Sequence, residues 1–164
     1  MPLFIAQTQH NINMNNKDVI IGVDCGKKGA FAFRHPDGTV FTENMPETAY
    51  DIYDLLLPYK GSVAYMEELH GMPGMSGTAM FTLGRNYGNV EIALLAAGIK
   101  VVKVSAQKWE KTYSLGSKSK AGGYSAWKRI LKGKAQELFP GLKVTLLNCD
   151  ALLINEYGYR EERK

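Results

Sequence analysis

Three acidic residues, Asp24, Glu67 and Asp150, come from distant parts of the chain and are the first candidates for chemistry. Asp24 and Glu67 each end a short apolar run, and Asp150 directly precedes another. An ionised carboxylate beside buried apolar residues is costly unless it is paired or binds a cation. Mg²⁺ prefers a few carboxylate oxygens together with waters and substrate phosphate, and two such ions can hold the attacking and leaving oxygens during phosphodiester hydrolysis. These residue types therefore point to a Mg²⁺ site, with Mn²⁺ as a substitute.

Each acid also has an ordinary structural explanation, which the residues alone leave open. An Asp in front of Cys25 and Gly26 is a common turn former. Asp150, at the start of a predicted helix, could simply complement the helix dipole. Adjacent residues of a strand point to opposite faces, so one of Glu67 and Glu68 must point outward, and either could be a solvated surface charge.

The elements that must position these acids follow a mixed α/β order. Apolar or alternating runs predict strands, and helical spacing of apolar residues predicts helices. The predicted strands are residues 19–24, 30–34, 39–43, 62–67 and 99–104. The first predicted helix begins at Pro46, and four more helices are predicted at about residues 78–97, 106–113, 125–138 and 148–162. A turn signal at residues 36–38 makes the first three strands an antiparallel meander. This order fits a single domain over residues 18–164, preceded by a polar, flexible arm over residues 1–17.

Positive charge is concentrated in one stretch of the chain. The net charge is +4, but residues 100–134 contain ten basic residues and one acidic residue, Glu110. Such a basic field indicates a polyanionic partner, bound with an affinity that falls steeply with salt. The residues predicted to contact phosphates are Lys108, Lys111, Lys118, Lys120, Lys128 and Lys132. The aromatic residues interleaved with them either stack on unpaired bases or anchor their helices in the core; they are Trp109, Tyr113, Tyr124 and Trp127.

Composition argues against export and against a membrane partner. The longest apolar runs, residues 19–23 and 92–98, are far shorter than the roughly 18 residues that a membrane span needs. The first ten residues lack the basic and apolar regions of a secretory signal. The two cysteines, Cys25 and Cys149, are predicted to be reduced and buried. We therefore expect a cytoplasmic protein.

Five segments carry motifs in a fixed order. They are residues 20–30 (Ile-Ile-Gly-Val-Asp-Cys-Gly-Lys-Lys-Gly-Ala), 66–74 (Met-Glu-Glu-Leu-His-Gly-Met-Pro-Gly), 81–88 (Phe-Thr-Leu-Gly-Arg-Asn-Tyr-Gly), 104–109 (Val-Ser-Ala-Gln-Lys-Trp) and 149–158 (Cys-Asp-Ala-Leu-Leu-Ile-Asn-Glu-Tyr-Gly). Together they resemble the RuvC-type Holliday junction resolvases, in particular their bacteriophage branch. The resemblance extends over about residues 19–160, and five motifs in the right order make it fairly specific.

The resemblance implies a fold, an activity and site residues. The fold would be ribonuclease H-like, a five-stranded mixed sheet of an antiparallel meander plus parallel strands, flanked by helices, in a homodimer. The activity would be structure-selective cutting of branched double-stranded DNA such as four-way junctions, in phage DNA processing. Asp24 would bridge two metal ions, with Glu67 and Asp150 completing one ion each. The loop after Glu67 would probe the junction centre with His70 or Met72.

The long helix from Thr78 resembles the dimer helix of the same family. Its Gly84 and Gly88, four residues apart, would permit close approach of a second helix. Core packing within the monomer is an equal alternative for this pair.

The last motif departs from the family pattern. The family normally places a fourth acid, or a His, three to four residues before Asp150, and here Leu146 and Leu147 occupy those positions. Either three acids plus water hold the ions, or Asn148 or His70 substitutes as an extra ligand. The alternative is a branched-DNA-binding protein of the same fold that no longer cuts.

A second resemblance points to a different class of protein. Residues 22–26, Gly-Val-Asp-Cys-Gly, also resemble the phosphate-binding turn of sugar kinases and actin-like ATPases. Those proteins need two such domains and more than twice this length. We therefore expect no nucleotide cofactor.

Overall fold

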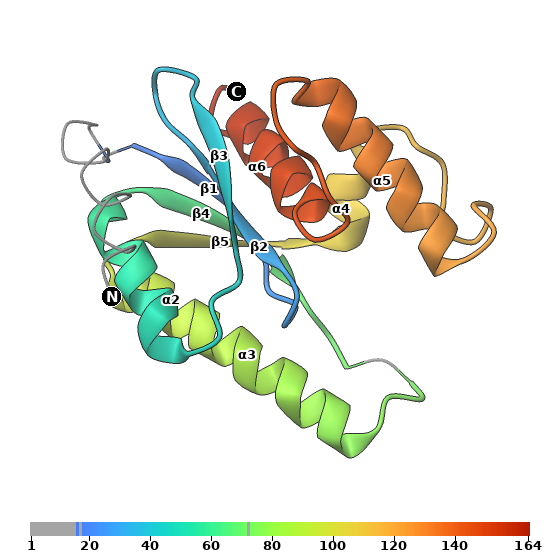
Figure 1. The fold of residues 1–164 in the computed structure, drawn as a ribbon, viewed down its shortest axis with the longest axis horizontal. Helices are drawn as coiled ribbons and strands as arrows, with labels where there is room; N and C mark the ends of the chain where they lie inside the picture. The colour runs from blue at the N-terminus through green and yellow to red at the C-terminus, as the bar shows by residue number, and fades with distance from the viewer. Residues whose placement is uncertain (1–15, 17, 72) are drawn as a thin grey trace, which may run out of the picture.

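The computed structural model describes residues 16, 18–71 and 73–164. The predicted flexible arm thus lies almost wholly outside the described residues. A five-stranded sheet in the order β3-β2-β1-β4-β5 forms the centre of the molecule (Figure 1). The strands are β1 (Ile20–Asp24), β2 (Ala30–Arg34), β3 (Val40–Asn44), β4 (Val63–Glu68) and β5 (Lys100–Ser105).

The central strand β1 fixes where two of the acids lie. It runs antiparallel to β2 and parallel to β4, and β4 runs parallel to β5. Ile21 pairs with Phe33 on one side and with Ala64 on the other. Because β1 and β4 are parallel, their carboxyl ends meet at the same edge of the sheet, and these ends carry Asp24 and Glu67.

Helices cover both faces of the sheet (Figure 1). The helices α2 (Ala49–Leu56) and α3 (Gly77–Ala96) lie on one face, together with the short 3₁₀ helix η1 (Leu57–Tyr59). The helices α4 (Ala106–Lys111), α5 (Tyr124–Leu138) and α6 (Cys149–Glu161) lie on the other. This three-layer arrangement confirms the predicted fold class, a five-stranded mixed sheet flanked by helices.

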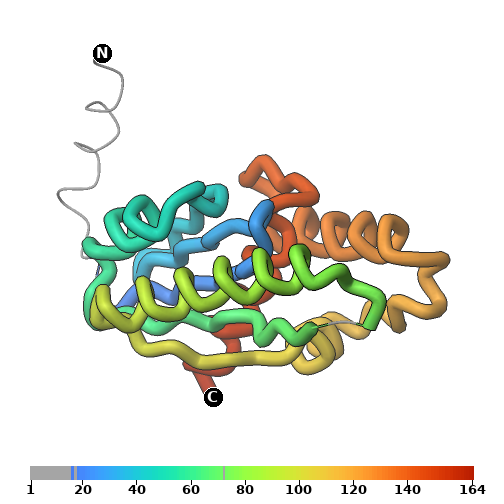
Figure 2. Tube along the Cα trace, turned by 90° about the horizontal axis from the view of Figure 1, so that it is seen from below, coloured from blue at the N-terminus to red at the C-terminus, as the bar shows by residue number. Residues whose placement is uncertain are grey.

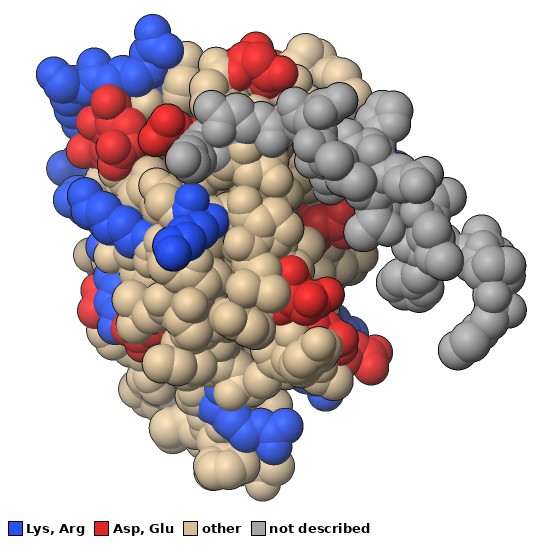
Figure 3. Space-filling model, turned by 90° about the vertical axis from the view of Figure 1, so that its left-hand side faces the viewer, with Lys and Arg blue, Asp and Glu red and all other residues tan. Residues whose placement is uncertain are grey.

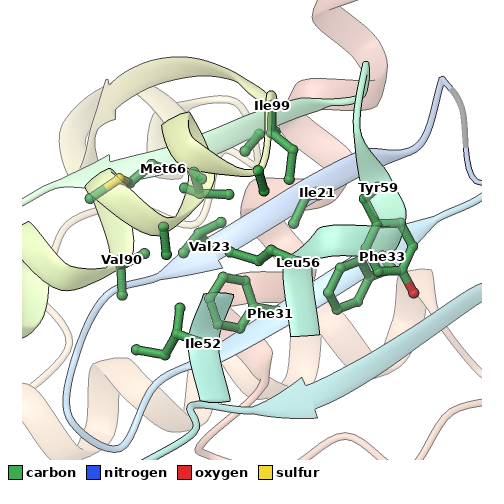
Figure 4. Packing of buried hydrophobic residues seen from close by; sticks show 14 of the residues in the cluster. Ile21, Val23, Phe31, Phe33, Ile52, Leu56, Tyr59, Met66, Val90 and Ile99 are labelled. Atoms are coloured by element: carbon green, nitrogen blue, oxygen red, sulfur yellow. The ribbon is translucent and has the colours of Figure 1, made fainter. Parts of the chain in front are cut away.

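Two hydrophobic clusters hold the layers together. Figure 4 shows the first, in which Ile21, Val23 and Phe31 of the sheet meet Ile52 of α2 and Val90 of α3. The second lies beneath α6, most of whose side chains are buried. Full burial of one such aliphatic or aromatic side chain contributes roughly 1.5–3 kcal/mol, so both clusters hold helices firmly against the sheet.

The sequence-based boundaries of the strands are confirmed to within one residue. The first helix differs, because α2 begins at Ala49 rather than at Pro46. Its N-cap is Thr48, whose hydroxyl accepts a hydrogen bond from the backbone N–H of Asp51 at 3.1 Å. A Thr side chain satisfies an unpaired N–H of the first turn, which Pro46 does not.

The two longest helices extend past the sheet on the same side. In Figures 1 and 2, α5 and the N-terminal half of α3 both extend in the direction of the carboxyl ends of β1 and β4. No residue of α3 before Val90 is buried. None of the helices in the described ranges is long and apolar enough to cross a membrane.

Candidate active site

A cleft of about 910 Å³ lies at the carboxyl edge of the sheet. Asp24, Glu67 and Asp150 all line it. They come from the end of β1, the end of β4 and the first turn of α6. The chain thus brings together three acids that lie 43 or more residues apart in sequence. Among the described residues, however, no group of three His, Cys, Asp or Glu side chains stands close enough to surround one metal ion.

Close packing of α6 against β1 brings Asp150 to this edge. A Cβ added to Gly22 of β1 would lie 2.2 Å from the carbonyl oxygen of Ala151 and 2.4 Å from the backbone nitrogen of Asn155. Only glycine leaves α6 room to approach this strand. The buried Asn155 amide then donates to the carbonyl oxygens of Ile20 at 2.7 Å and of Ala32 at 2.9 Å. The start of α6 is therefore fixed relative to β1.

The turn after β1 holds the Asp24 side chain. The backbone N–H of Gly26 donates to Oδ1 of Asp24 at 3.0 Å. Gly29 closes the turn by donating to the carbonyl oxygen of Gly26 at 2.8 Å, and a Cβ at Gly29 would lie 2.1 Å from the Asp24 carbonyl oxygen. Gly22 and Gly29 of this motif are thus required by close backbone contact, and the motif's Cys25 is buried.

Negative charge in the cleft is poorly solvated. Burial raises the pKa of Asp24 to about 6, the charge of Asp150 adds to the rise, and the Gly26 N–H and Lys128 oppose it. Burial likewise raises the pKa of Glu67 to about 8, and the charges of Asp24 and Asp150 add to it. Mutual effects of this kind need the three carboxylates to lie near one another. A cation placed among them would relieve both the repulsion and the lost hydration.

Lys128 of α5 supplies one positive charge within the cleft. Its Nζ lies 2.5 Å from Oδ2 of Asp150, and both side chains are less than 15% exposed. Burial alone would lower the pKa of Lys128, but the Asp150 carboxylate outweighs burial and the pKa lies above its usual value. Lys128 was predicted to contact phosphates on a basic surface, and the structure instead places it inside the site, paired with an acid.

Besides the three predicted acids and Glu68, the cleft contains Glu110, which the sequence did not suggest as a site residue. Glu110 of α4 lines the cleft and accepts a hydrogen bond from Nε1 of Trp127 at 3.0 Å. Burial raises the pKa of Glu110, the Trp127 bond lowers it, and the charge of Asp150 raises it further. In the sequence, the only feature that could have marked Glu110 as a site residue is its position as the single acid in the basic stretch of residues 100–134.

The proposed extra ligand Asn148 is not brought to the cleft. Its side chain is buried beneath β3, where Oδ1 accepts from the backbone N–H of Thr145 at 2.8 Å. Its Nδ2 donates to Oγ1 of Thr42 at 3.1 Å and to the carbonyl oxygen of Lys143 at 3.2 Å. These bonds occupy the amide in this structure, and a ligand role for Asn148 stays a prediction.

The residues flanking Asp150 and Glu67 do line the cleft. Leu146 and Leu147 lie there with 47% and 42% of their surface exposed, at the positions where an acid was expected. His70 also lines the cleft and is exposed. Met72 lies outside the described residues, so its predicted role at a junction centre stays a prediction.

The remaining basic residues are divided between the cleft and the outer surface. Lys108, Lys111 and Lys120 are exposed outside the cleft. Lys118 lines the cleft, with Nζ 4.8 Å from the ring centre of Tyr124. Lys132 is partly buried. Cleft-lining basic residues that the sequence analysis did not select are Lys28 and Arg129.

Most of the interleaved aromatic residues belong to the core. Trp109, Tyr113 and Trp127 are at most 7% exposed. The Tyr113 hydroxyl donates to the carbonyl oxygen of Leu153. Stacking of these three rings on bases is therefore excluded, whereas Tyr124 is 62% exposed and is available for it.

Mg²⁺ fits the donor set of this site. Asp24, Glu67 and Asp150 are hard oxygen ligands in a cleft with room for water and phosphate. Lys128 occupies one oxygen of Asp150 in the geometry described here. An ion at Asp150 would have to share that carboxylate with Lys128 or displace it.

Comparison with known proteins defines a class of fold. No protein-family model matches the chain, and no curated protein sequence matches it either. Solved structures do match, and RuvC structures are among them. The fold is therefore RuvC-like.

The particular matches cover nearly the whole chain at low identity. Thermus thermophilus RuvC in complex with a Holliday junction substrate matches with a TM-score of 0.56 and 13% identity, over 88% of this chain and 96% of that one. A second Thermus thermophilus RuvC structure matches with a TM-score of 0.55 and 14% identity, again over 88% of this chain and 96% of that one. The yeast mitochondrial Holliday junction resolvase Ydc2 matches with a TM-score of 0.45 and 15% identity, over 93% of this chain and 82% of that one.

Proposed function

We propose that this protein is a Mg²⁺-dependent endonuclease that cuts branched DNA, including four-way junctions. Residues 18–164 form its nuclease domain. The single observation that carries the proposal is the meeting of Asp24, Glu67 and Asp150 in one cleft of a RuvC-like fold. The motif resemblance supports a role in bacteriophage DNA processing, in the cytoplasm of the host.

In this proposal the three acids hold the divalent ions. Mg²⁺, when bound, supplies a water of lowered pKa and neutralises charge on the phosphodiester. The carboxylates must be ionised to bind a cation, so the site gains affinity as Asp24 and Glu67 lose their protons. Lys128 offsets part of the negative charge and offers an N–H donor within the same cleft.

Basic residues around the cleft would bind the DNA backbone. Lys118 and Arg129 border the acids directly, and Lys108, Lys111, Lys120 and Lys132 extend the basic field. The side of the molecule drawn in Figure 3 instead shows Lys and Arg interspersed with Asp and Glu. We assign the DNA path to α4, α5 and the segment between them because these carry the basic residues.

The α3 helix supports a homodimer. Phe81, Ile92 and Leu95 are exposed apolar residues, and helical spacing places them on one face with Gly84 and Gly88. A Cβ at either glycine would have no neighbour within 4 Å, so this face is not used for packing inside the monomer. Two active sites related by two-fold symmetry would suit a four-way junction, whose opposing strands are related in the same way.

The test is strand-specific cleavage of a synthetic four-way junction in Mg²⁺. We expect paired nicks on opposing strands with 5′-phosphate and 3′-hydroxyl ends. The Asp24→Asn variant should bind the junction with unchanged affinity and leave it uncut. Absence of nicking by the unmutated protein in both Mg²⁺ and Mn²⁺ contradicts the proposal.

A second candidate function is binding of branched DNA without cutting. Two observations favour it: Leu146 and Leu147 stand where a further acid was expected, and Lys128 pairs with Asp150. It predicts tight, salt-sensitive binding with no nicking. Replacement of Leu147 by Asp would then supply the missing carboxylate and restore cleavage.

A further inference from the structure

A second cleft, of about 590 Å³, adjoins the first. It lies between the β1–β2 turn, the end of β3 and the middle of α3. Lys28, Gly29 and Leu147 line both clefts, so they are continuous. Residues of α4 and α5 line the first cleft and not the second.

The second cleft is lined by hydrogen-bond donors and positive charge. Lys27, Lys28 and Arg85 are exposed, and none of them forms an ion pair with any residue that the structure describes. Asn44, Asn86 and Asn89 add amide donors and acceptors. The single acid in the lining is Glu47, which is exposed. Arg, Lys and Asn side chains are the groups that proteins use to contact DNA phosphates and sugars.

The walls of the second cleft are tied to the proposed catalytic residue. Nδ2 of Asn86 donates to the carbonyl oxygen of Cys25 at 2.7 Å, which joins α3 to the β1–β2 turn. The backbone N–H of Met45 donates to the carbonyl oxygen of Gly29 at 3.0 Å, which joins the turn to the end of β3. In the same turn, the backbone N–H of Gly26 donates to Oδ1 of Asp24. Lys27 and Lys28 therefore stand at a fixed place relative to Asp24.

We propose that the second cleft binds the backbone of the cleaved DNA strand where it continues past the scissile phosphate. The strand would approach over the α4–α5 basic residues, pass the three acids, and leave over Lys28 between Lys27 and Arg85. This inference rests on the proposed function, since it assumes that the first cleft receives a DNA phosphate. It assigns a DNA contact to a part of the chain outside the basic block of residues 100–134.

The test compares two double variants that remove the same charge. Lys27→Ala with Arg85→Ala removes two cations from the second cleft. Lys60→Ala with Lys100→Ala removes two exposed cations at the amino ends of β4 and β5, the opposite edge of the sheet. All four residues are exposed, so both variants should fold, with circular dichroism melting as the check.

Junction affinity is measured as a function of salt. Two lost phosphate contacts should reduce the slope of log affinity against log salt by about 1.8 for the second-cleft variant, and the affinity itself by tenfold or more. The control variant should keep the slope of the unmutated protein. Equal slopes for the second-cleft variant and the unmutated protein would overturn the inference.

Strand truncation then locates the contact. The cleaved strand is ended one nucleotide beyond the scissile phosphate, first on its 5′ side and then on its 3′ side. One truncation should weaken binding by the unmutated protein and leave binding by the Lys27→Ala, Arg85→Ala variant unchanged. If both truncations weaken the two proteins equally, the second cleft does not hold the strand.

The two proposals fail in different ways. If the unmutated protein does not cleave the junction but its salt slope still exceeds that of the second-cleft variant, the nuclease proposal is contradicted and the DNA contact is kept. Cleavage with no slope difference contradicts the DNA contact alone. Failure of the unmutated protein to bind the junction contradicts both.

Discussion

At the scale of single residues, protonation of Glu67 and Asp24 links the candidate site to stability. Their folded-state pKa values, about 8 and about 6, exceed the ordinary values of 4.5 and 3.8. At a pH between the ordinary pKa and the folded-state pKa of either group, the folded protein holds a proton that the unfolded chain has released. Stability contributed by these protons is complete below the ordinary pKa and is lost as pH rises through the folded one.

The metal-free protein should therefore become less stable between about pH 5 and 8. One pKa unit corresponds to about 1.4 kcal/mol, so Glu67 alone should account for a change of a few kcal/mol. Glu67→Gln should flatten the dependence of melting temperature on pH in EDTA, whereas Glu68→Gln, at the exposed neighbour, should not. A Glu67→Gln curve that still falls as steeply as that of the unmutated protein would contradict the assigned pKa.

Lys128 offers a second prediction at this scale. Lys128→Met leaves the largely buried Asp150 carboxylate without its cation, which should cost roughly 3 kcal/mol of stability without metal. Mg²⁺ should then raise the melting temperature more in the variant than in the unmutated protein, because the ion no longer competes with an ammonium group. Lys132→Met, one turn further along α5, serves as the control. If Mg²⁺ raises the melting temperature equally in the unmutated protein and in both variants, Asp150 is not a ligand for which Mg²⁺ and Lys128 compete.

The acids of the site could be predicted from sequence, but their partners could not. Asp24 and Glu67 each end an apolar run that forms a strand, and Asp150 precedes an apolar run that forms a helix. Pairing of Lys128 with Asp150 depends on how α5 crosses α6, which no spacing within either helix records. The position of Glu110 has the same origin, because its bond to Trp127 joins α4 to α5.

At the scale of elements, the contact of α6 with β1 positions the site. Gly22→Ala would force a methyl group onto the backbone of α6 at Ala151 and Asn155. We expect a loss of about 3 kcal/mol or more, because the helix backbone cannot yield as a side chain can. Junction cleavage should fall as well, since α6 carries Asp150.

Gly133→Ala is the matched control for this change. Gly133 lies inside α5, and a Cβ there would meet nothing within 4 Å. Alanine should stabilise that helix by roughly 0.5–1 kcal/mol. Thermal melts of both variants check the pair, and a Gly22→Ala protein as stable as the unmutated one would mean that α6 does not approach β1 so closely.

Element boundaries followed from sequence wherever a hydrophobic period was clear. The five strands and α3, α5 and α6 are examples, since apolar spacing marked each of them. The start of α2 was misplaced because two signals competed, Pro46 and Thr48, and the Thr48 cap bond decided it. The turn η1 carried only Leu57, Pro58 and Tyr59, too short a segment to show a period.

At the scale of the whole molecule, the exposed face of α3 predicts the oligomeric state. Ile92→Glu places a charge in the proposed dimer contact, where Ile92 is 61% exposed in the single chain. The monomer should fold normally, and sedimentation should show at least tenfold weaker dimerisation. Tyr50→Glu, on the exposed surface of α2, should leave the dimer intact. A monomeric unmutated protein, or an unaffected Ile92→Glu dimer, contradicts this arrangement.

Convergence of Asp24, Glu67 and Asp150 on divalent ions is the central claim, and a crystal structure with Mn²⁺ tests it most directly. The anomalous signal of Mn²⁺ locates the ion independently of any cleavage assay. We predict at least one ion coordinated by an oxygen of Asp24 and by an oxygen of Glu67 or Asp150, with the Lys128–Asp150 distance lengthened. A crystal saturated with Mn²⁺ that shows no ion at these carboxylates and an intact Lys128–Asp150 pair would contradict the account.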